Sequence, residues 1–245
     1  MTGKASATSI EELLADLLKA SREYLVYQQE NGMAGIDRKV LEKARGEDGT
    51  AAKKNPAEEL RKAKRELGEC TRCALSKSRT NIVFGEGDPF ARIMFVGEAP
   101  GKDEDAQGLP FVGKSGKMLT DIIEKGMKIS RSEVYITSVT KCHPPGERTP
   151  RPEEVETCFP FLKMQIESIK PKVIVALGAV AAQAITGSGT PISGIRGVWH
   201  EWNGIPVMPT YHPSYLLRKA TAKKEVWEDI KKVMKKTGIP LEETK

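Results

Sequence analysis

The four cysteines are the side chains of this 245-residue chain best suited to hold a metal. They are Cys70, Cys73, Cys142 and Cys158: a C-x2-C pair, then 68 residues, then a C-x15-C pair. A C-x2-C turn points two thiolates at one metal, and disulfides are not expected in a cytoplasmic chain. The wide second interval favours an iron–sulfur cluster. Zinc held by the same four thiolates, or four unrelated buried thiols, remain alternatives.

Residues 108–115, GLPFVGKS, fit the G-x-x-x-x-G-K-[ST] pattern of a nucleotide-binding P-loop. Such a loop follows its strand directly and lines the phosphates with backbone N–H groups. Here ten residues separate the apolar run RIMFVG from Gly108, and Pro110 has no N–H to offer. The runs VYITSV and KVIVALG end without the aspartate that would help to hold Mg²⁺. The sequence therefore argues against an ATPase.

Four apolar runs predict the strands that must position any site: RIMFVG, VYITSV, KVIVALG and IPVMPTY. Segments with helical spacing separate them, such as SGKMLTDIIEKGM and RPEEVETCFPFLKMQIESI. Asn55 and Pro56 are typical of a helix start, and this helix should run through Leu67. GVWHEWNGIPV is typical of a hairpin turning at Asn203 and Gly204, which would add an antiparallel strand. The alternation predicts an α/β fold with helices covering a parallel sheet.

Residues 1–54 are expected to form a separate N-terminal part. Ser9 and Glu12 form a capping-box pattern, and the apolar residues from Ile10 to Leu25 recur at helical spacing, which predicts an amphipathic helix. Residues 31–54 are rich in Gly, Ala and charge, which is typical of a flexible linker. We therefore expect domain boundaries at 1–54 and 55–245, with the N-terminal helix free to contact another protein.

The net charge of +6 lies entirely in residues 56–245, because residues 1–55 hold nine Lys or Arg and nine Asp or Glu. This distribution suits a polyanionic partner, although solvated Lys-rich surfaces are common. No apolar run approaches the roughly 20 residues that span a bilayer, and the first residues lack the layout of a signal peptide. We expect a cytoplasmic, monomeric protein without membrane contact.

Three motifs carry a resemblance to a known family: GEAPGKDEDAQGLPFVGKSG, CHPPGERTPRPEE and HPSYLLR. In this order, and with the cysteine spacing, they resemble the family 4 uracil-DNA glycosylases, the iron–sulfur class of bacteria and archaea. The resemblance implies one three-layer α/β/α domain with a short, mainly parallel four-stranded sheet. It also implies that the four cysteines hold a [4Fe–4S] cluster.

The activity that the resemblance implies is hydrolysis of the N-glycosidic bond of uracil in single- or double-stranded DNA, which leaves an abasic site. Such an enzyme must take the nucleotide out of the helix, stack its base and read its edge. The sugar becomes oxocarbenium-like while uracil leaves as an anion, so a carboxylate and a hydrogen-bond donor at O2 favour the transition state. The alternative is a non-catalytic, glycosylase-like DNA-binding module associated with replication or repair.

By this resemblance, three residues are catalytic candidates. Glu98 would position or activate the attacking water, and Glu104 matches a second acidic position. A neutral His212 would donate a hydrogen bond to uracil O2. Uracil would bind at Phe111, which stacks on the base, and at Gly97, Ala99 and Gly101, whose backbone approaches it closely. DNA contacts are expected from two segments. The helix start at Lys114, Ser115 and Gly116 would hold a DNA phosphate. Leu216 and Leu217 would wedge into the minor groove in the space that the base leaves, with Arg218 on a phosphate.

Ser138 departs from the family pattern. The family usually reads the uracil edge with Asn in a strand-end TNV, whereas this chain has TSV. An amide offers both a donor and an acceptor, while a hydroxyl is shorter and reaches less far. We therefore expect weakened or broadened base specificity, which would extend to other deaminated bases.

Overall fold

A computed structural model describes residues 55–241 of the protein. The helix and linker expected within residues 1–54 lie outside the described residues. Among residues 55–241, no helix is both long and apolar enough to cross a bilayer.

Within this range the sheet has six strands in the order β1-β3-β2-β4-β6-β5. The inner four are parallel, and β1 and β5 pair antiparallel at the two edges. The strands are β1 (Glu86–Gly87), β2 (Ile93–Gly97), β3 (Tyr135–Ser138), β4 (Val173–Leu177), β5 (His200–Trp202) and β6 (Ile205–Thr210). The mainly parallel α/β fold is confirmed, with six strands where four were expected.

The two additional strands have different sequence signals. The turn between β5 and β6 has Asn203 at φ 48° and Gly204 at φ 82°, as a hairpin turn of the expected kind requires. Strand β1 has only two residues, one of them Gly87, and therefore lacks an apolar run that could be recognised.

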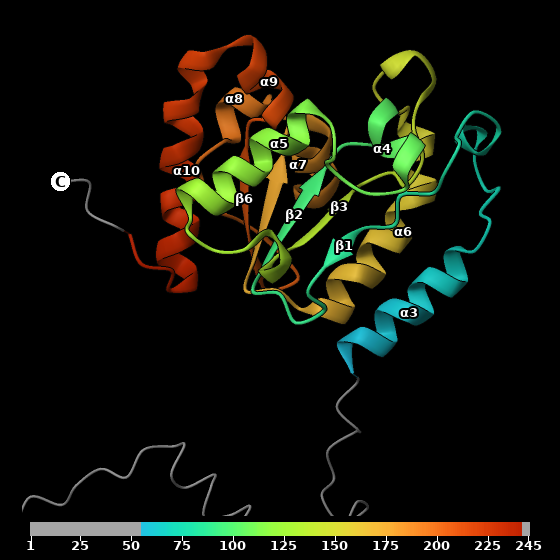
Figure 1. Cartoon of the computed structure of the whole chain (residues 1–245), viewed down its shortest axis with the longest axis horizontal. Coiled ribbons are helices and arrows are strands. Elements are labelled where there is room, and N and C mark those ends of the chain that lie inside the picture. Colours follow the sequence, from blue (N-terminus) through green and yellow to red (C-terminus); the bar gives the residue numbers. More distant parts are fainter. Residues whose placement is uncertain (1–54, 242–245) are drawn as a thin grey trace, which may run out of the picture. The chain divides into compact units, whose positions relative to one another are not determined.

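Helices cover both faces of the sheet (Figure 1). They are α3 (Pro56–Leu67), α4 (Lys102–Gln107), α5 (Lys114–Thr120), α6 (Pro152–Ile169), α7 (Ala179–Thr186), α8 (Ile192–Ile195), α9 (Pro213–Arg218) and α10 (Lys223–Thr237). Short turns of 3₁₀-helix occupy Ala74–Lys77, Arg131–Glu133, Pro145–Glu147 and Ala220–Ala222, and a π-helical turn at Asp121–Gly126 continues α5. The predicted start of α3 is confirmed, because the Asn55 side chain accepts a hydrogen bond from Ala57 N at 3.0 Å.

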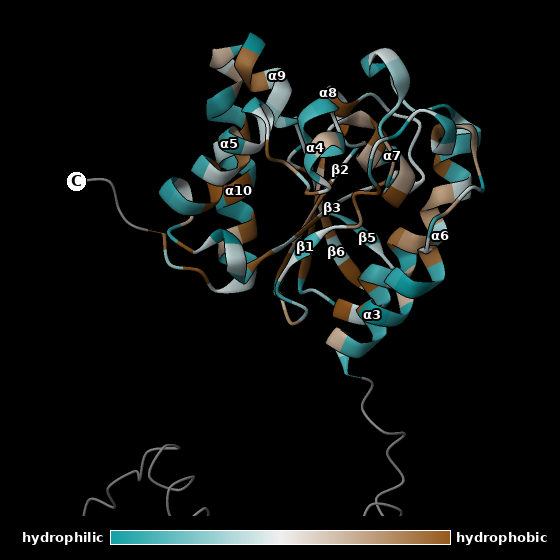
Figure 2. Cartoon of the chain, turned by 45° about the vertical axis from the view of Figure 1, so that its right-hand side comes forward, coloured by the Kyte–Doolittle hydropathy of each residue, from teal (hydrophilic) through white to brown (hydrophobic). Residues whose placement is uncertain are grey.

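Two apolar cores lie on opposite faces of the sheet. Met94 and Val96 of β2 pack with residues of α3, α6 and α7, whereas Ile93 and Phe95 pack with residues of α5 and α10. All residues of β2 and β4 are buried, because helices cover both of their faces. Apolar residues accordingly concentrate at the centre in Figure 2. The three-layer α/β/α arrangement brings the carboxyl ends of β2, β3, β4 and β6 to one edge, where α/β proteins bind ligands.

Candidate active site

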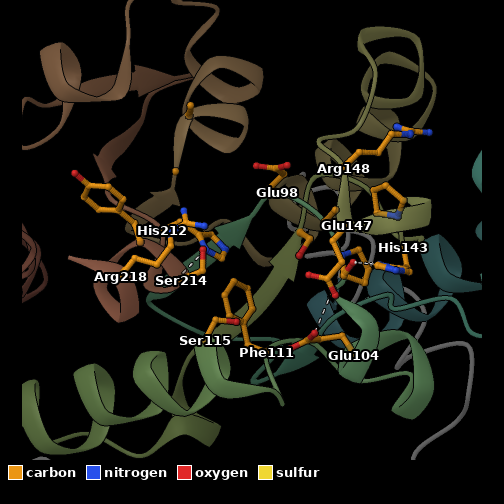
Figure 3. Close-up of a pocket in the computed structure, with 18 residues that line it drawn as sticks. Glu98, Glu104, Phe111, Ser115, His143, Glu147, Arg148, His212, Ser214 and Arg218 are labelled. Carbon is orange, nitrogen blue, oxygen red and sulfur yellow. Dashed lines mark hydrogen bonds between the residues drawn. The ribbon is translucent and has the colours of Figure 1, made fainter. Parts of the chain in front are cut away.

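A pocket of about 310 Å³ opens at this carboxyl edge of the sheet. Its wall comes from segments that follow β2, β3, β4 and β6 and from the loop between α4 and α5. Figure 3 shows the Glu98 carboxylate, the Phe111 ring and the His212 imidazole around one cavity. Most of the site residues expected from the sequence line it: Glu98, Ala99, Gly101, Glu104, Phe111, Ser115, Ser138, His212 and Arg218.

Phe111 is held against two glycines. A Cβ atom on Gly97 would lie 2.6 Å from the Phe111 ring, and one on Gly116 would lie 1.9 Å from the Phe111 carbonyl oxygen. Phe111 itself has φ 52°, in the left-handed region that non-glycine residues rarely occupy. Only glycine at both positions lets the aromatic ring lie on the end of β2. Gly116 itself is buried against the Phe111 backbone, in the first turn of α5.

Glu104 fastens the Phe111 loop. Its Oε1 accepts hydrogen bonds from Val112 N at 2.9 Å and Gly113 N at 3.0 Å, and its Oε2 accepts one from Gly101 N at 3.1 Å. The residue is 7% exposed. Both carboxylate oxygens are therefore engaged by backbone amides of the two loops that form this side of the pocket.

Arg131 holds the same loop from the other side. Its Nη2 donates to the Pro110 carbonyl oxygen at 2.8 Å and also to Glu86 Oε1 at 2.8 Å. Its Nη1 donates to Thr120 Oγ1 at 3.0 Å. Sequence reasoning missed Arg131, because these partners are distant in the chain and no local pattern connects them.

His212 is held as a neutral hydrogen-bond donor. It caps α9, where Ser214 N donates to Nδ1 at 3.2 Å and Ser214 Oγ lies 2.8 Å from Nδ1. A backbone amide can only donate, so Nδ1 accepts and the single proton of the neutral ring is on Nε2. Burial, followed by the nearby Arg218 charge, lowers the pKa of His212 to about 4. The ring is therefore neutral at pH 7, with Nε2–H available to a ligand.

The His212 ring also meets the aromatic ring of Phe111. Their centroids are 5.6 Å apart, and the ring planes are tilted by 33°. Ser214, which sets the His212 tautomer, was not among the expected site residues. The N-cap pattern H-P-S was the sequence signal for it.

Glu98 follows β2 directly and is only partly exposed. Burial raises the pKa of its carboxyl group, and a hydrogen bond with Thr149 opposes this in part. Its backbone carbonyl accepts from Thr140 N at 3.1 Å, which ties the segment after β2 to the segment after β3. Unlike Glu104, this carboxylate accepts no backbone N–H within the described residues.

Ser138 ends β3, beside Gly97 of β2, and is 3% exposed. Its Oγ atom would lie 3.3 Å from a Cβ on Gly97, so it faces the same end of β2 as the Phe111 ring. The Ser138 hydroxyl makes no hydrogen bond within residues 55–241. It is therefore free to meet a ligand.

The expected wedge leucines lie in different environments. Leu216 is 2% exposed and belongs to the core that includes Ala222 and Val226, whereas Leu217 is 48% exposed. Successive residues of a helix point about 100° apart, which allows Leu216 to face the core while Leu217 faces solvent. The expectation of a DNA contact is corrected for Leu216. Leu217, Lys114 and the rim residue Arg218 remain accessible.

The four cysteines gather beside this site and form no disulfides. Arg79 Nη1 donates to the Cys70 carbonyl oxygen at 2.6 Å and to Cys142 Sγ at 3.4 Å, and the backbone N of Lys141, next to Cys142, donates to Cys158 Sγ at 3.3 Å. The cysteines therefore come together from three segments of the chain. Among residues 55–241, no three His, Cys, Asp or Glu side chains converge as ligands of a single metal ion.

The segment that joins the cysteines to the pocket contains His143, which lines the pocket. Its Nδ1 lies 2.9 Å from the Pro100 carbonyl oxygen, an acceptor, so Nδ1–H donates. This hydrogen bond ties the residue after Cys142 to the loop that follows Glu98. The sequence placed His143 beside Cys142 but indicated no partner for it.

The sequence of the chain is similar to that of known proteins of one family. A family profile described as the uracil DNA glycosylase superfamily matches residues 84–231. A type-4 uracil-DNA glycosylase of Thermotoga maritima is 48% identical over 177 residues, which cover 69% of this chain and 92% of the relative. The chain belongs to the type-4 uracil-DNA glycosylase family.

Two archaeal members of the type-4 uracil-DNA glycosylases give similar matches. The Sulfurisphaera tokodaii protein is 43% identical over 182 residues, covering 71% of this chain and 83% of its own. The Archaeoglobus fulgidus protein is 45% identical over 177 residues, covering 69% and 88%. The family resemblance of the three sequence motifs is confirmed.

Proposed function

We propose that the protein removes uracil from DNA by hydrolysing the N-glycosidic bond and leaves an abasic site. The observation that carries this proposal is the convergence of Glu98, Phe111 and His212, from three separate segments, on one pocket. A non-catalytic DNA-binding module would need neither a neutral imidazole donor nor a carboxylate in that pocket. Their presence together supports the enzyme.

Phe111 provides the surface on which the everted base stacks. Its ring lies against Gly97 at the end of β2, and Ala99 and Gly101 line the same pocket. Base–aromatic stacking contributes about 1–3 kcal/mol per base. The hydrogen bonds from Val112 and Gly113 to Glu104 hold this surface in place before DNA binds. We therefore assign Glu104 a positioning role in place of the catalytic role expected from the sequence.

His212 and Glu98 act on the charges that develop as the bond breaks. The Nε2–H of His212 donates to uracil O2 and stabilises the departing anion, and removal of one such donor typically costs about 10²- to 10³-fold in kcat. The Glu98 carboxylate stabilises the oxocarbenium-like sugar and accepts a proton from the attacking water. Its raised pKa makes it a stronger proton acceptor than an exposed glutamate.

The base specificity of this pocket depends on Ser138. Its free hydroxyl both donates and accepts, but it reaches less far into the pocket than the Asn usual in the family. A bridging water fills the difference for uracil. We propose that the same space admits other deaminated bases, such as hypoxanthine and xanthine.

DNA binds across the mouth of the pocket. Arg218 and Ser115 at the rim and the exposed Lys114 contact the phosphate backbone, and Leu217 fills the gap that the everted base leaves in a duplex. A single strand contains no such gap, so Leu217 matters for duplex substrates alone.

The four cysteines fit a [4Fe–4S] cluster. They are four thiols, the number that such a cluster takes, and a cluster distributes them over four irons. A single zinc ion, at Zn–S distances of about 2.3 Å, needs its ligands to converge closely, which supports the cluster over zinc. The cluster would supply no chemistry to hydrolysis and would join three chain segments beside the pocket. Cys142→Ser should abolish the visible absorbance and lower the melting temperature, and retention of full iron content would contradict the assignment.

We infer further that the protein is a monomer in the cytoplasm and that residues 1–54 contact another protein. Light scattering of the purified full chain tests the oligomeric state. A stable dimer would contradict this inference without touching the glycosylase assignment.

Base release provides the decisive test of function. Single- and double-stranded oligonucleotides with one uracil are incubated with the protein, treated with alkali and separated on a denaturing gel. We expect the strand to be cleaved at uracil, and we expect no cleavage of a thymine-containing control. In Glu98→Ala and His212→Ala the rate should fall at least 100-fold. Uncut uracil strands from the folded, cluster-containing protein would refute the proposal.

A further inference from the structure

Lys141 is a lysine buried in the core between the pocket and the cysteines. It is 0% exposed, lies three residues after Ser138 and directly precedes Cys142. A buried ammonium is costly unless each of its N–H groups has an acceptor. Its Nζ donates to the Ser138 carbonyl oxygen at 2.5 Å, to Gln165 Oε1 at 2.7 Å and to Thr137 Oγ1 at 2.8 Å. Three donors meet three acceptors.

All three of these acceptors are neutral. Gln165 in turn donates to the Phe84 carbonyl oxygen at 2.7 Å, and Thr137 Oγ1 donates to the same oxygen at 2.9 Å. No Asp or Glu of the described residues forms an ion pair with Lys141, whereas two cysteines adjoin its backbone: Cys142 follows it in the chain, and Cys158 Sγ accepts from its N–H. A fully buried ammonium whose hydrogen-bond acceptors are all neutral is stabilised further by a negative charge nearby.

The cysteine site would supply that charge. Thiolates bound to a cluster are anionic, and N–H groups directed at their sulfurs tune such sites. The backbone N of Lys141 donates to Cys158 Sγ at 3.3 Å, and Arg79 Nη1 donates to Cys142 Sγ at 3.4 Å. Gln165 follows Cys158 by seven residues on α6, which is two turns and therefore the same face of the helix.

We propose that Lys141 is a positioning residue whose ammonium is the buried counter-charge of the thiolate-bound cluster and, through the Ser138 carbonyl, holds the base-reading end of β3. The proposal rests on the cluster and the uracil pocket described above. It predicts that the state of the cysteine site and the binding of the base are linked through one side chain.

The first test replaces Lys141 by Met and compares it with Lys77→Met in the cluster-containing full-length protein. Lys77 lies four residues after Cys73 but is exposed, so its replacement removes the same charge where water screens it. With an iron chelator, Lys141→Met should lose its visible absorbance roughly tenfold faster than wild type, because a hydrogen-bonded buried charge is gone. Its reduction potential should shift downward, since a neighbouring cation favours the reduced cluster. Lys77→Met should match wild type in both measurements.

The second readout is base binding. Lys141→Met should raise KM for uracil-containing DNA more than it lowers kcat, because Ser138 contacts the base and not the sugar. If Lys141→Met matches Lys77→Met in cluster lifetime, potential and KM, the proposal is overturned. A purified wild-type protein without iron would overturn it too. If wild type holds a cluster but releases no uracil, the glycosylase assignment fails, while the lifetime and potential still decide the role of Lys141.

If Lys141→Met does not fold, Thr137→Val tests the proposed role of Lys141. Valine keeps the shape of threonine and the charge of Lys141 but removes one of its three acceptors, while Gln165 still serves the Phe84 carbonyl. A cluster lifetime and a KM that both move in the direction predicted for Lys141→Met, by a smaller factor, support the proposal. Unchanged values of both would refute it.

Discussion

Glu98 and Glu104 lie six residues apart, but replacing each by Gln should have opposite effects. Glu104→Gln should lower stability and keep much of the activity, whereas Glu98→Gln should keep stability and lower the activity. In Glu104→Gln, one carboxylate oxygen becomes an amide NH₂ that faces backbone N–H donors. At least one of the three hydrogen bonds from Gly101, Val112 and Gly113 is lost. A hydrogen bond to a charged group contributes about 1.5–3 kcal/mol, so we expect the free energy of unfolding to fall by roughly 2–4 kcal/mol. At about 2–4 °C per kcal/mol, the melting temperature should drop by roughly 4–16 °C.

Glu98→Gln should keep or raise the melting temperature at pH 7. Burial raises the pKa of Glu98 in the folded protein, so ionising this group costs folding free energy. That cost is absent below the unfolded pKa of the group and develops as pH rises through the higher folded value. The gain in melting temperature from Glu98→Gln should therefore grow as the pH rises, while kcat falls by about 10²- to 10⁴-fold.

Differential scanning calorimetry between pH 4 and 8 and single-turnover uracil release measure both effects. Glu104→Gln should retain much of its kcat once DNA is saturating, because its carboxylate touches the loop and not the substrate. A Glu104→Gln protein with unchanged melting temperature and a kcat as low as that of Glu98→Gln would refute the assignment of the two roles.

Three further outcomes follow from the geometry. Ser138→Asn should sharpen the preference for uracil over hypoxanthine and xanthine in a base-release assay, and unchanged rates for all three bases would contradict the role of Ser138. Leu217→Ala should slow uracil release from duplex several-fold but not from single strands, whereas Leu216→Ala should lower stability by about 2–5 kcal/mol as a core truncation; the reverse pattern in denaturant titrations would be inconsistent with their burial. The pKa of His212, lowered to about 4, means that wild type excludes a proton on folding and loses stability as pH falls from about 6.5 towards 4; His212→Asn should remove this part of the pH dependence, and identical stability profiles would count against a neutral His212.

The parallel core of the fold was predictable because each of its strands is a run of apolar residues. A strand that is buried on both faces shows no alternation of apolar and polar residues, so it is recognised by the length of its apolar run and by the turn residues at its ends. The caps at Asn55 and the turn at Asn203 and Gly204 depend on local chemistry, which a single sequence reveals. Strand β1 depends instead on backbone pairing with β3, to which two residues without an apolar side chain contribute no signal.

For the site, the family resemblance of the motifs was sufficient to predict that Glu98, Phe111 and His212 lie together, and all three line one pocket. The sequence could not predict which way each side chain points, or which hydrogen-bond partners come from distant segments of the chain. Leu216 and Leu217 differ by one helical step, and the two glutamates differ only in which backbone amides come near them. Arg131 and Lys141 were missed because their acceptors lie in other segments, and only the folded chain brings those segments together.

The antiparallel strands at the two margins of the sheet have a further consequence. β1 spans two residues and β5 three, so neither margin presents a long row of unsatisfied backbone amides and carbonyls. The four parallel strands lie between these short edge strands, so their backbone groups are already paired within the sheet. Edge-to-edge growth into aggregates is thereby disfavoured.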